Sequence, residues 1–474
     1  MVVIRYVCLS DLHLGADNSL LTHLNADSVV DPLQPSAVLT DLISWLASVL
    51  REVNGALRPT LILNGDLLEL ALALDNKAIM AFERLLELLF PVGKEPLVAD
   101  EIVFLPGNHD HHMWETARET QYAQFLQRRD PGTFLEPPWH ATQMFNLDAP
   151  LSVAAPILNS VIDRYVYLRG RVNVKTVYPN YGILNEKKTK CVIFTHGHYV
   201  EPIYLLMTRL GNTLFPDRPK PIFIWDIEAE NFAWIDFFWS AMGRSGDVGD
   251  YIERVYDMLL VPELRSKLAH QIGQLAGREW FANHPELGKI LGGGLTPLVS
   301  HVLDRSYGLE KMQTDQALSP DAQAGLKWYV QDPLRQQLLM ELDDNTPEEV
   351  TVIFGHTHKP FSATYTFAGF PGPTYVYNSG GWVVDTETIE PMHGGAIVLV
   401  DDELNVVSAR MYNEAKDASQ YGVRIESLRP SLLLDSVNQA ADLASEQAAA
   451  FSKATATAVD AYHQNFKRRL DQTL

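Results

Sequence analysis

Cysteine is nearly absent from this chain. Only two of its 474 residues are cysteines, Cys8 and Cys191. Two cysteines cannot form the disulfide framework of a small secreted domain, and they offer no cysteine-rich zinc site. Each lies in an apolar run typical of a core strand, so we expect both side chains to be buried as small hydrophobic groups.

Positive charge is also scarce. The sequence contains 38 Lys and Arg against 59 Asp and Glu, which gives a formal net charge of −21. Long contacts with a nucleic-acid backbone need stripes of Lys and Arg, so no nucleic-acid partner is expected. A small phosphate ester is not excluded as a substrate, because bound cations would dominate the local field.

Long hydrophobic runs are missing as well. No stretch offers ~20 apolar residues without charges, so no membrane-spanning helix is expected. The first predicted strand begins within a few residues of Met1 and leaves no room for a cleaved signal peptide, so we expect a cytoplasmic protein. Hydrophobic content of 46% and charged content of 20% describe a globular protein with a large core.

Five short polar motifs follow apolar runs that we interpret as strands. The motifs are Ser-Asp-Leu-His-Leu-Gly (10–15), Asn-Gly-Asp (64–66), Gly-Asn-His-Asp (107–110), Thr-His-Gly-His (195–198) and Gly-His-Thr-His (355–358). Five strands would thus deliver carboxylate, amide and imidazole groups to one edge of a sheet. These groups, without thiolates, suit divalent cations such as Mn, Fe, Zn, Ni or Mg. The five motifs together predict a metal-dependent hydrolase.

In these motifs the chain resembles the calcineurin-like metallophosphoesterase superfamily, whose pattern is D-x-H, G-D, G-N-H, H and G-H-x-H. The resemblance implies two divalent metal ions, with Mn as the first choice, and a bridging water that attacks phosphorus. Its substrate would be a small phosphodiester, pyrophosphate or phosphomonoester. Carried over residue by residue, the ligands are Asp11, His13 and His358 for one metal, Asn108, His196 and His356 for the other, and Asp66 as the bridge.

Other side chains near the motifs are candidates for catalysis or substrate binding. The resemblance places His109 beside the metals as a proton donor or charge stabiliser, a task that suits a histidine pKa. Glu69 either orients that histidine or is exposed at the start of a helix. His198 is a candidate substrate contact, whereas His111 and His112 are expected at a helix N-terminus that faces solvent.

Parts of the motifs are similar to two branches of the superfamily. Ser-Asp-Leu-His-Leu, Asn-Gly-Asp-Leu and Gly-His-Thr-His-Lys-Pro resemble bacterial UDP-2,3-diacylglucosamine pyrophosphohydrolases, which carry Arg where this chain has His109. Gly-Asn-His-Asp also suits phosphodiesterases of cyclic or other small nucleotides. The chain lacks the Arg that protein serine/threonine phosphatases carry after their second motif, which argues against that activity. A non-catalytic scaffold usually lacks ligands, and here none is missing.

The order of predicted elements indicates an α/β fold: a sandwich of two packed mixed sheets flanked by helices. We assign residues 1–199 and 346–425 to this core, 200–345 to a large and mostly helical insertion, and 426–474 to a helical tail. Within these parts we expect helices after Ser36, over 77–89 and after Ser319. A strand is expected over 165–177, and a hairpin over 394–411.

The insertion is the main open question, because 160 positions separate His196 from His356. Its stretch 221–242 is rich in aromatic residues. That stretch is either a buried helix of the insertion's own core or an apolar lid, in which case Trp234 and Trp239 would contact substrate. A third alternative is docking to a membrane surface or a lipid-like substrate. The sequence does not indicate an oligomeric state.

Overall fold

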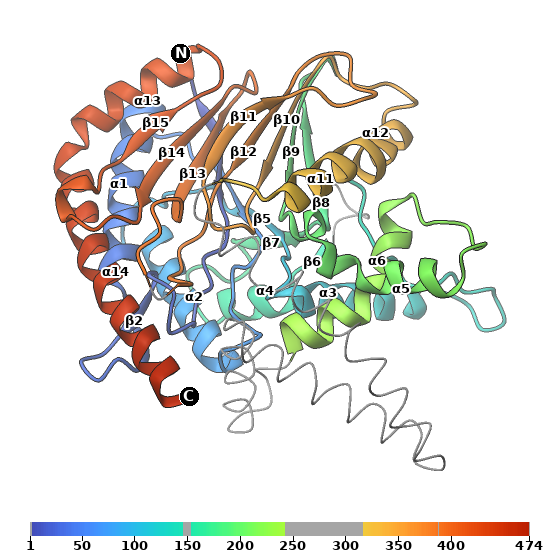
Figure 1. Cartoon of the computed structure of the whole chain (residues 1–474), viewed down its shortest axis with the longest axis horizontal. Helices are drawn as coiled ribbons and strands as arrows, with labels where there is room; N and C mark the ends of the chain where they lie inside the picture. Colours follow the sequence, from blue (N-terminus) through green and yellow to red (C-terminus); the bar gives the residue numbers. More distant parts are fainter. Residues whose placement is uncertain (1, 146–152, 242–315, 387, 474) are drawn as a thin grey trace.

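The computed structural model describes residues 2–145, 153–241, 316–386 and 388–473. Two β-sheets packed face to face form its centre, with helices on both outer sides (Figure 1). The larger sheet contains, in spatial order, β15 (Arg424–Glu426), β14 (Val406–Asn413), β13 (Gly394–Asp401), β1 (Ile4–Leu9), β4 (Thr60–Asn64), β5 (Glu101–Leu105), β7 (Asn173–Thr176) and β6 (Val153–Ala154). This is the predicted α/β sandwich.

The smaller sheet has five strands of mixed direction. They are, in spatial order, β11 (Phe361–Tyr365), β12 (Thr374–Asn378), β10 (Glu349–Phe354), β9 (Lys190–Thr195) and β8 (Asn180–Leu184). A separate ribbon pairs β2 (Thr22–Leu24) with β3 (Val30–Pro35). Apolar side chains from the two large sheets meet in one buried cluster, which includes Cys8, Ile62 and Val103 on one side and Val192, Phe194 and Ile353 on the other. Strands covered on both faces need continuous apolar runs, which explains those runs in the sequence.

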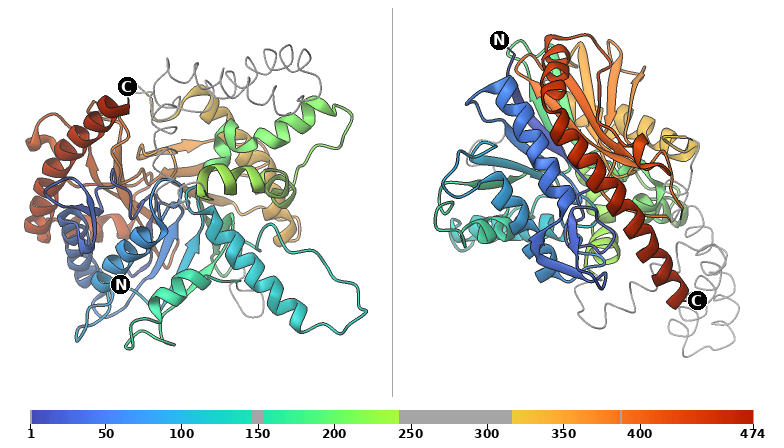
Figure 2. Two further views of the ribbon diagram at one scale, coloured as in Figure 1. Left: turned by 90° about the horizontal axis from the view of Figure 1, so that it is seen from below. Right: turned by 90° about the vertical axis from the view of Figure 1, so that its left-hand side faces the viewer.

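Helices cover the outer face of the larger sheet. They are α1 (Ala37–Asn54), α2 (Asp75–Leu89), α4 (Pro156–Ile162), α13 (Leu432–Leu443) and α14 (Ser445–Thr473). The long C-terminal α14 lies against α1 (Figure 2). As predicted, α1 begins after Ser36, whose hydroxyl accepts a hydrogen bond from the Leu39 backbone N–H at 3.0 Å.

The outer face of the smaller sheet packs against α6 (Ile224–Asp236), α11 (Pro320–Tyr329) and α12 (Arg335–Glu341). Two further helices, α3 (His111–Gln127) and α5 (Leu206–Leu214), lie beside α6. Ser319 caps α11 as expected, since its hydroxyl accepts from the Ala322 backbone N–H at 3.0 Å. Residues 242–315 of the predicted insertion lie outside the described residues. None of the helices that the structure describes has the length and apolar character of a membrane span.

One predicted element is wrong in part. Of the strand expected over 165–177, only β7 is a strand, and residues 163–172 form successive turns. Backbone hydrogen bonds from Leu168 N to Tyr165 O and from Val172 N to Leu168 O close these turns. Gly170 has φ of 67°, a conformation that ends an extended run and favours glycine. The alternation of apolar residues there therefore reflects turns that pack on the core. The hairpin expected over 394–411 is confirmed as β13 and β14.

Candidate metal centre

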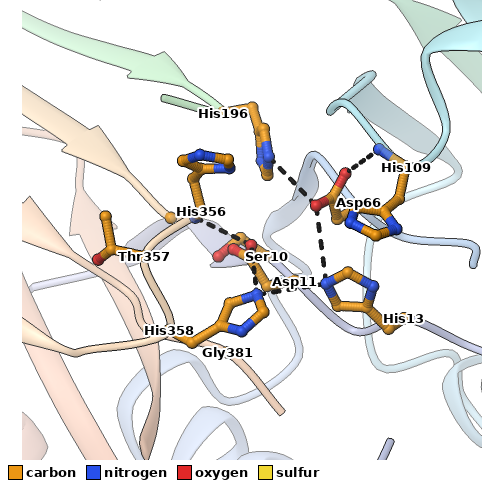
Figure 3. Close-up of polar contacts among 12 residues, drawn as sticks. Ser10, Asp11, His13, Asp66, His109, His196, His356, Thr357, His358 and Gly381 are labelled. Carbon is orange, nitrogen blue, oxygen red and sulfur yellow. Dashed lines mark hydrogen bonds and ion pairs between the residues drawn. The ribbon is translucent and has the colours of Figure 1, made fainter. Parts of the chain in front are cut away.

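The motif residues lie at the carboxyl ends of parallel strands. In the larger sheet β1, β4 and β5 are parallel, and in the smaller sheet β9, β10 and β12 are parallel. Both sets of strands end at the same edge of the sandwich, where their loops meet (Figure 3). A hydrogen bond joins the sheets there, in which the Asn64 side chain donates to the Thr195 carbonyl at 2.9 Å. The predicted ligands that meet at this edge are Asp11, His13, Asp66, Asn108, His196, His356 and His358.

The first cluster contains Asp11, His13 and His358. The Nε2 atoms of the two histidines are 3.3 Å apart, and His358 Nε2 lies 3.4 Å from Asp11 Oδ1. All three side chains are at most 2% exposed. The second oxygen of Asp11, Oδ2, is buried and has no hydrogen-bond partner among the described residues. Lone pairs that converge in a buried space without donors are unfavourable, so this cluster fits a cation.

The second cluster contains Asp66, Asn108, His196 and His356. His196 Nε2 lies 3.0 Å from Asn108 Oδ1 and 3.3 Å from Asp66 Oδ2. The same Asp66 oxygen is 3.6 Å from His13 Nε2 of the first cluster. Asp66 therefore lies between the two ligand sets (Figure 3). Imidazole, carboxylate and amide oxygen form a donor set suited to divalent transition metals.

The backbone at this site is strained. Five of the seven predicted ligands have left-handed φ values, which are 53° for Asp11, 44° for His13, 49° for Asp66, 68° for His356 and 56° for His358. Such conformations cost on the order of 1–3 kcal/mol each and persist where the surrounding structure enforces them. Backbone hydrogen bonds of 2.9 Å from Asp11 N to Gly65 O and from His13 N to Asp66 O hold the first three of these residues. These backbone conformations direct the side chains of neighbouring motifs into the same space.

Two motif glycines are required by close packing of the ligands. A Cβ on Gly65 would lie 2.2 Å from His196 Nδ1, and one on Gly355 would lie 1.9 Å from Asp11 Oδ2. Gly65 also has φ of 87°. The glycines of Asn-Gly-Asp and Gly-His-Thr-His therefore leave room for ligand side chains rather than merely permitting turns.

Acceptors around the clusters set the orientation of the histidine rings. His13 Nδ1 donates to Glu69 Oε2 at 2.9 Å, His358 Nδ1 donates to Asp385, and His196 Nδ1 lies 3.3 Å from the Asn64 carbonyl. A proton held on Nδ1 leaves the Nε2 lone pair directed into the site. Asp385 and Glu201 were not among the predicted site residues. Oε1 of Glu201 lies 2.8 Å from His356 Nε2. Neither residue belongs to a recognisable motif.

Glu69 is 2% exposed, so the alternative of an exposed helix start is wrong. Its Oε1 accepts from His109 Nδ1 at 2.9 Å while its other oxygen holds His13. Burial disfavours the charge on Glu69, but the charge and hydrogen bonds of His109, followed by those of His13, outweigh it and lower its pKa to about 2. The backbone N–H of His109 also donates to Asp66 Oδ1 at 2.8 Å. The catalytic role of this pair stays a prediction.

Asp110 links the second and third motifs, a role that the sequence analysis did not foresee. It accepts hydrogen bonds from the backbone N–H groups of Gly107 at 2.6 Å and Leu67 at 2.7 Å. Burial and then the charge of Asp66 raise its pKa to about 7. The last residue of Gly-Asn-His-Asp therefore holds the loops of the second and third motifs together.

The expectation that His111 faces solvent is wrong. This residue is fully buried, and its Nε2 lies 2.8 Å from Oε1 of Glu228 on α6. The reason is that α6 packs across the first turn of α3. Tyr178 donates to the other oxygen of Glu228 at 2.9 Å, and Tyr199 donates to it as well. The carboxylate thus joins the insertion to the core beside the centre. His112 is half-buried rather than exposed to solvent.

Of the three residues proposed to bind substrate, His198 lies beside the second cluster, and Trp239 is linked to it through Tyr204. His198 is 1% exposed, and its ring centroid is 5.6 Å from that of His196. Trp239 is 3% exposed and lies 5.1 Å from Tyr204, whose ring is in turn 5.1 Å from His356. Trp234 is partly buried and donates to the Ile203 carbonyl at 2.9 Å. Both tryptophans pack into the apolar cluster of the insertion and smaller sheet. Their contact with substrate stays a prediction.

Comparison with known families gives one match. The model of the calcineurin-like phosphoesterase family matches residues 4–218. The matched part contains the ligands from Asp11 to His196, and the structure adds His356 and His358 from the loop after β10. A comparison with curated proteins found no match.

Proposed function

Residues 4–218 belong to the calcineurin-like phosphoesterase family, and from this premise we propose a dinuclear metal-dependent hydrolase of small phosphodiesters, pyrophosphates or phosphomonoesters. The family consists of phosphoester hydrolases, so the chain is a metallophosphoesterase. Within the proposal, cyclic or other small nucleotides are the alternative substrate class.

The position of Asp66 carries the dinuclear proposal. One oxygen of this carboxylate lies 3.6 Å from His13 Nε2 and 3.3 Å from His196 Nε2, which belong to different ligand sets. A single carboxylate between two sets is the arrangement that holds two cations ~3.5–4 Å apart. Bound divalent ions would lower the pKa of a coordinated water and neutralise charge on the phosphate oxygens. We propose Mn ahead of Fe, Zn, Ni or Mg, because the donors are imidazole and oxygen without thiolate.

His109 is the proposed proton donor to the leaving group. Glu69 holds its Nδ1 proton, so the proton exchanged with substrate is the one on Nε2. The ring lies beside the first ligand set, with its centroid 4.7 Å from that of His13. This arrangement supports proton transfer at the metal centre rather than elsewhere on the surface.

The test is replacement of Asp66 by Asn. Metal analysis should show that both sites are weakened, because an amide bridges two cations poorly. Hydrolysis of bis-p-nitrophenyl phosphate and p-nitrophenyl phosphate with added Mn should fall together. Asp27→Asn, at an exposed position, is the matched control and should keep wild-type metal content and activity. An Asp66→Asn protein with full metal content and activity would refute the dinuclear assignment.

One observation favours a second candidate function, a lipid-like substrate or a membrane surface as partner. In the described part of the insertion, five large apolar side chains are exposed: Met207 at 43%, Phe215 at 65%, Ile222 at 51%, Phe237 at 65% and Met340 at 57%. Where such side chains form one patch, they mark a surface that meets lipid or protein. Flotation with liposomes tests this candidate, and a protein that stays at the bottom of the gradient rejects it.

A further inference from the structure

We propose that His112, Glu115 and Asp236 form a separate cation site, which binds one divalent ion of the Zn²⁺ type and joins α6 of the insertion to α3 of the core. His112 and Glu115 are three residues apart and share one face of α3. Asp236 is the last residue of α6. The site does not depend on the proposed hydrolysis, because it shares no residue with the metal centre.

The distances within the site match a bound ion. His112 Nδ1 lies 3.1 Å from Glu115 Oε2 and 3.3 Å from Asp236 Oδ1, and one ligand atom from each residue falls within 4.8 Å of the others. An ion with tetrahedral bonds of ~2.0–2.2 Å separates its ligands by roughly 3.2–3.6 Å. One imidazole and two carboxylates leave a fourth position for water.

Two atoms of this cluster lack a well-formed hydrogen bond. His112 Nδ1 and Asp236 Oδ1 are buried atoms that have no hydrogen bond of acceptable geometry within the described residues. Burial and then the charge of Asp236 raise the pKa of Glu115, since the two carboxylates repel each other. A protonated His112 could donate from Nδ1 to only one of them. A cation accepts lone pairs from all three groups.

A second buried nitrogen points at the same carboxylate. His111 is fully buried, its Nδ1 has no hydrogen-bond partner within the described residues, and this atom lies 3.6 Å from Asp236 Oδ1. Glu228 holds the opposite ring nitrogen at 2.8 Å. Burial opposes the charge on His111, but Glu228 and then Asp236 outweigh it and raise its pKa to about 9. His111 is therefore a cation paired with Asp236 and not a further ligand of the proposed ion.

The proposed ion would link the insertion to the loop that contains His109. The first turn of α3 follows directly after His109, and the His112 backbone N–H donates to Ser240 just beyond α6 at 2.8 Å. An ion that links Asp236 to α3 would therefore stabilise the packing of α6 beside the metal centre. Its role is structural, since none of its ligands is among the groups assigned to hydrolysis.

Zinc binding to three variants tests the proposal. Protein stripped with chelator and reloaded with Zn²⁺ should bind about one equivalent less in Asp236→Asn and Glu115→Gln than in wild type. Asp226→Asn, an exposed carboxylate on the same helix, is the matched control and should bind as wild type does. Added Zn²⁺ should also raise the melting temperature less in the two site variants than in the control.

Activity measurements exclude the metal centre as the source of the missing equivalent of Zn²⁺. Both site variants should keep hydrolysis of bis-p-nitrophenyl phosphate, whereas Asp66→Asn should lose it and still bind the ion at Asp236. Equal zinc content in wild type, Asp236→Asn and Glu115→Gln overturns the proposal. If Asp236→Asn does not fold, Glu115→Gln carries the test alone, because that residue lies on the partly exposed side of α3.

Discussion

Replacement of Glu69 by Gln should weaken the first metal site more than the second. Oε1 of Glu69 accepts from the backbone N–H groups of Ala71 and Leu72 at 3.0 Å each, and also from His109. Among the described residues, Oε2 hydrogen-bonds to His13 Nδ1 alone. The amide oxygen of Gln will take the position with three donors. Its NH₂ group then faces His13 and displaces the proton from Nδ1 to Nε2, the atom that should bind metal.

The expected loss of metal affinity follows from one reversed interaction, the hydrogen bond between residue 69 and His13 Nδ1. A hydrogen bond to a charged group contributes about 1.5–3 kcal/mol, and each ~1.4 kcal/mol is a factor of ten in affinity. Loss of the partner behind a metal-bound histidine typically weakens binding 10–100-fold. We therefore expect the site at His13 and His358 to bind Mn²⁺ roughly 10–100-fold more weakly in Glu69→Gln, with the site at His196 nearly unchanged.

Calorimetric titration of the stripped protein with Mn²⁺ measures the two sites separately. Glu95→Gln, an exposed glutamate, is the control and should titrate as wild type does. His109→Ala separates the two hydrogen bonds of Glu69, since it removes one imidazole and leaves His13 oriented. Equal weakening of both sites in Glu69→Gln, or unchanged affinity at both, would refute the tautomer argument.

Three further predictions follow from individual side chains. His109→Ala should keep its metal content while turnover falls ~10²–10⁴-fold, with a smaller loss for substrates that have good leaving groups; loss of metal would make it a ligand instead. Trp239→Ala should destabilise the fold by roughly 3–5 kcal/mol in denaturant melts, because the ring is 3% exposed. If Trp239 also binds substrate, KM for the natural substrate should rise more than for a chromogenic ester, and equal effects on both would limit it to packing. Burial opposes the charge on His463, but the hydrogen bond and charge of Glu414 outweigh it and raise its pKa. The ion pair between these residues therefore stabilises the fold fully below ~pH 6.5, and its contribution is lost as the pH rises through the raised pKa. His463→Gln should therefore be less stable than wild type at pH 6 and approach it at pH 9, and an equal gap at both pH values would contradict the ion pair.

Local sequence was sufficient to predict which polar side chains follow core strands, and also the main elements. A strand, a tight turn and a polar side chain at its end depend on neighbouring residues, so Asp11, Asp66 and His356 could each be placed at the end of a strand without coordinates. The expectation of one sheet was wrong, because these strands belong to two sheets. The same holds for the start of α1, because the Ser36 cap acts on a backbone group three residues away. The apolar runs of β1 and β10 likewise predicted strands that are buried in the core.

Contacts between distant segments were decided only by the tertiary structure. His111 looked like a surface residue because the partner that buries it, Glu228, lies 117 positions away. Asp385 and Glu201 orient ligand rings from loops without any motif, and a single carboxylate in a loop has no pattern that marks it. Hydrogen bonds and burial of this kind depend on which surfaces pack together, whereas backbone propensity and short motifs do not. For that reason the sequence predicted which motif side chains gather at the centre, and only the fold placed α6 and the groups around them.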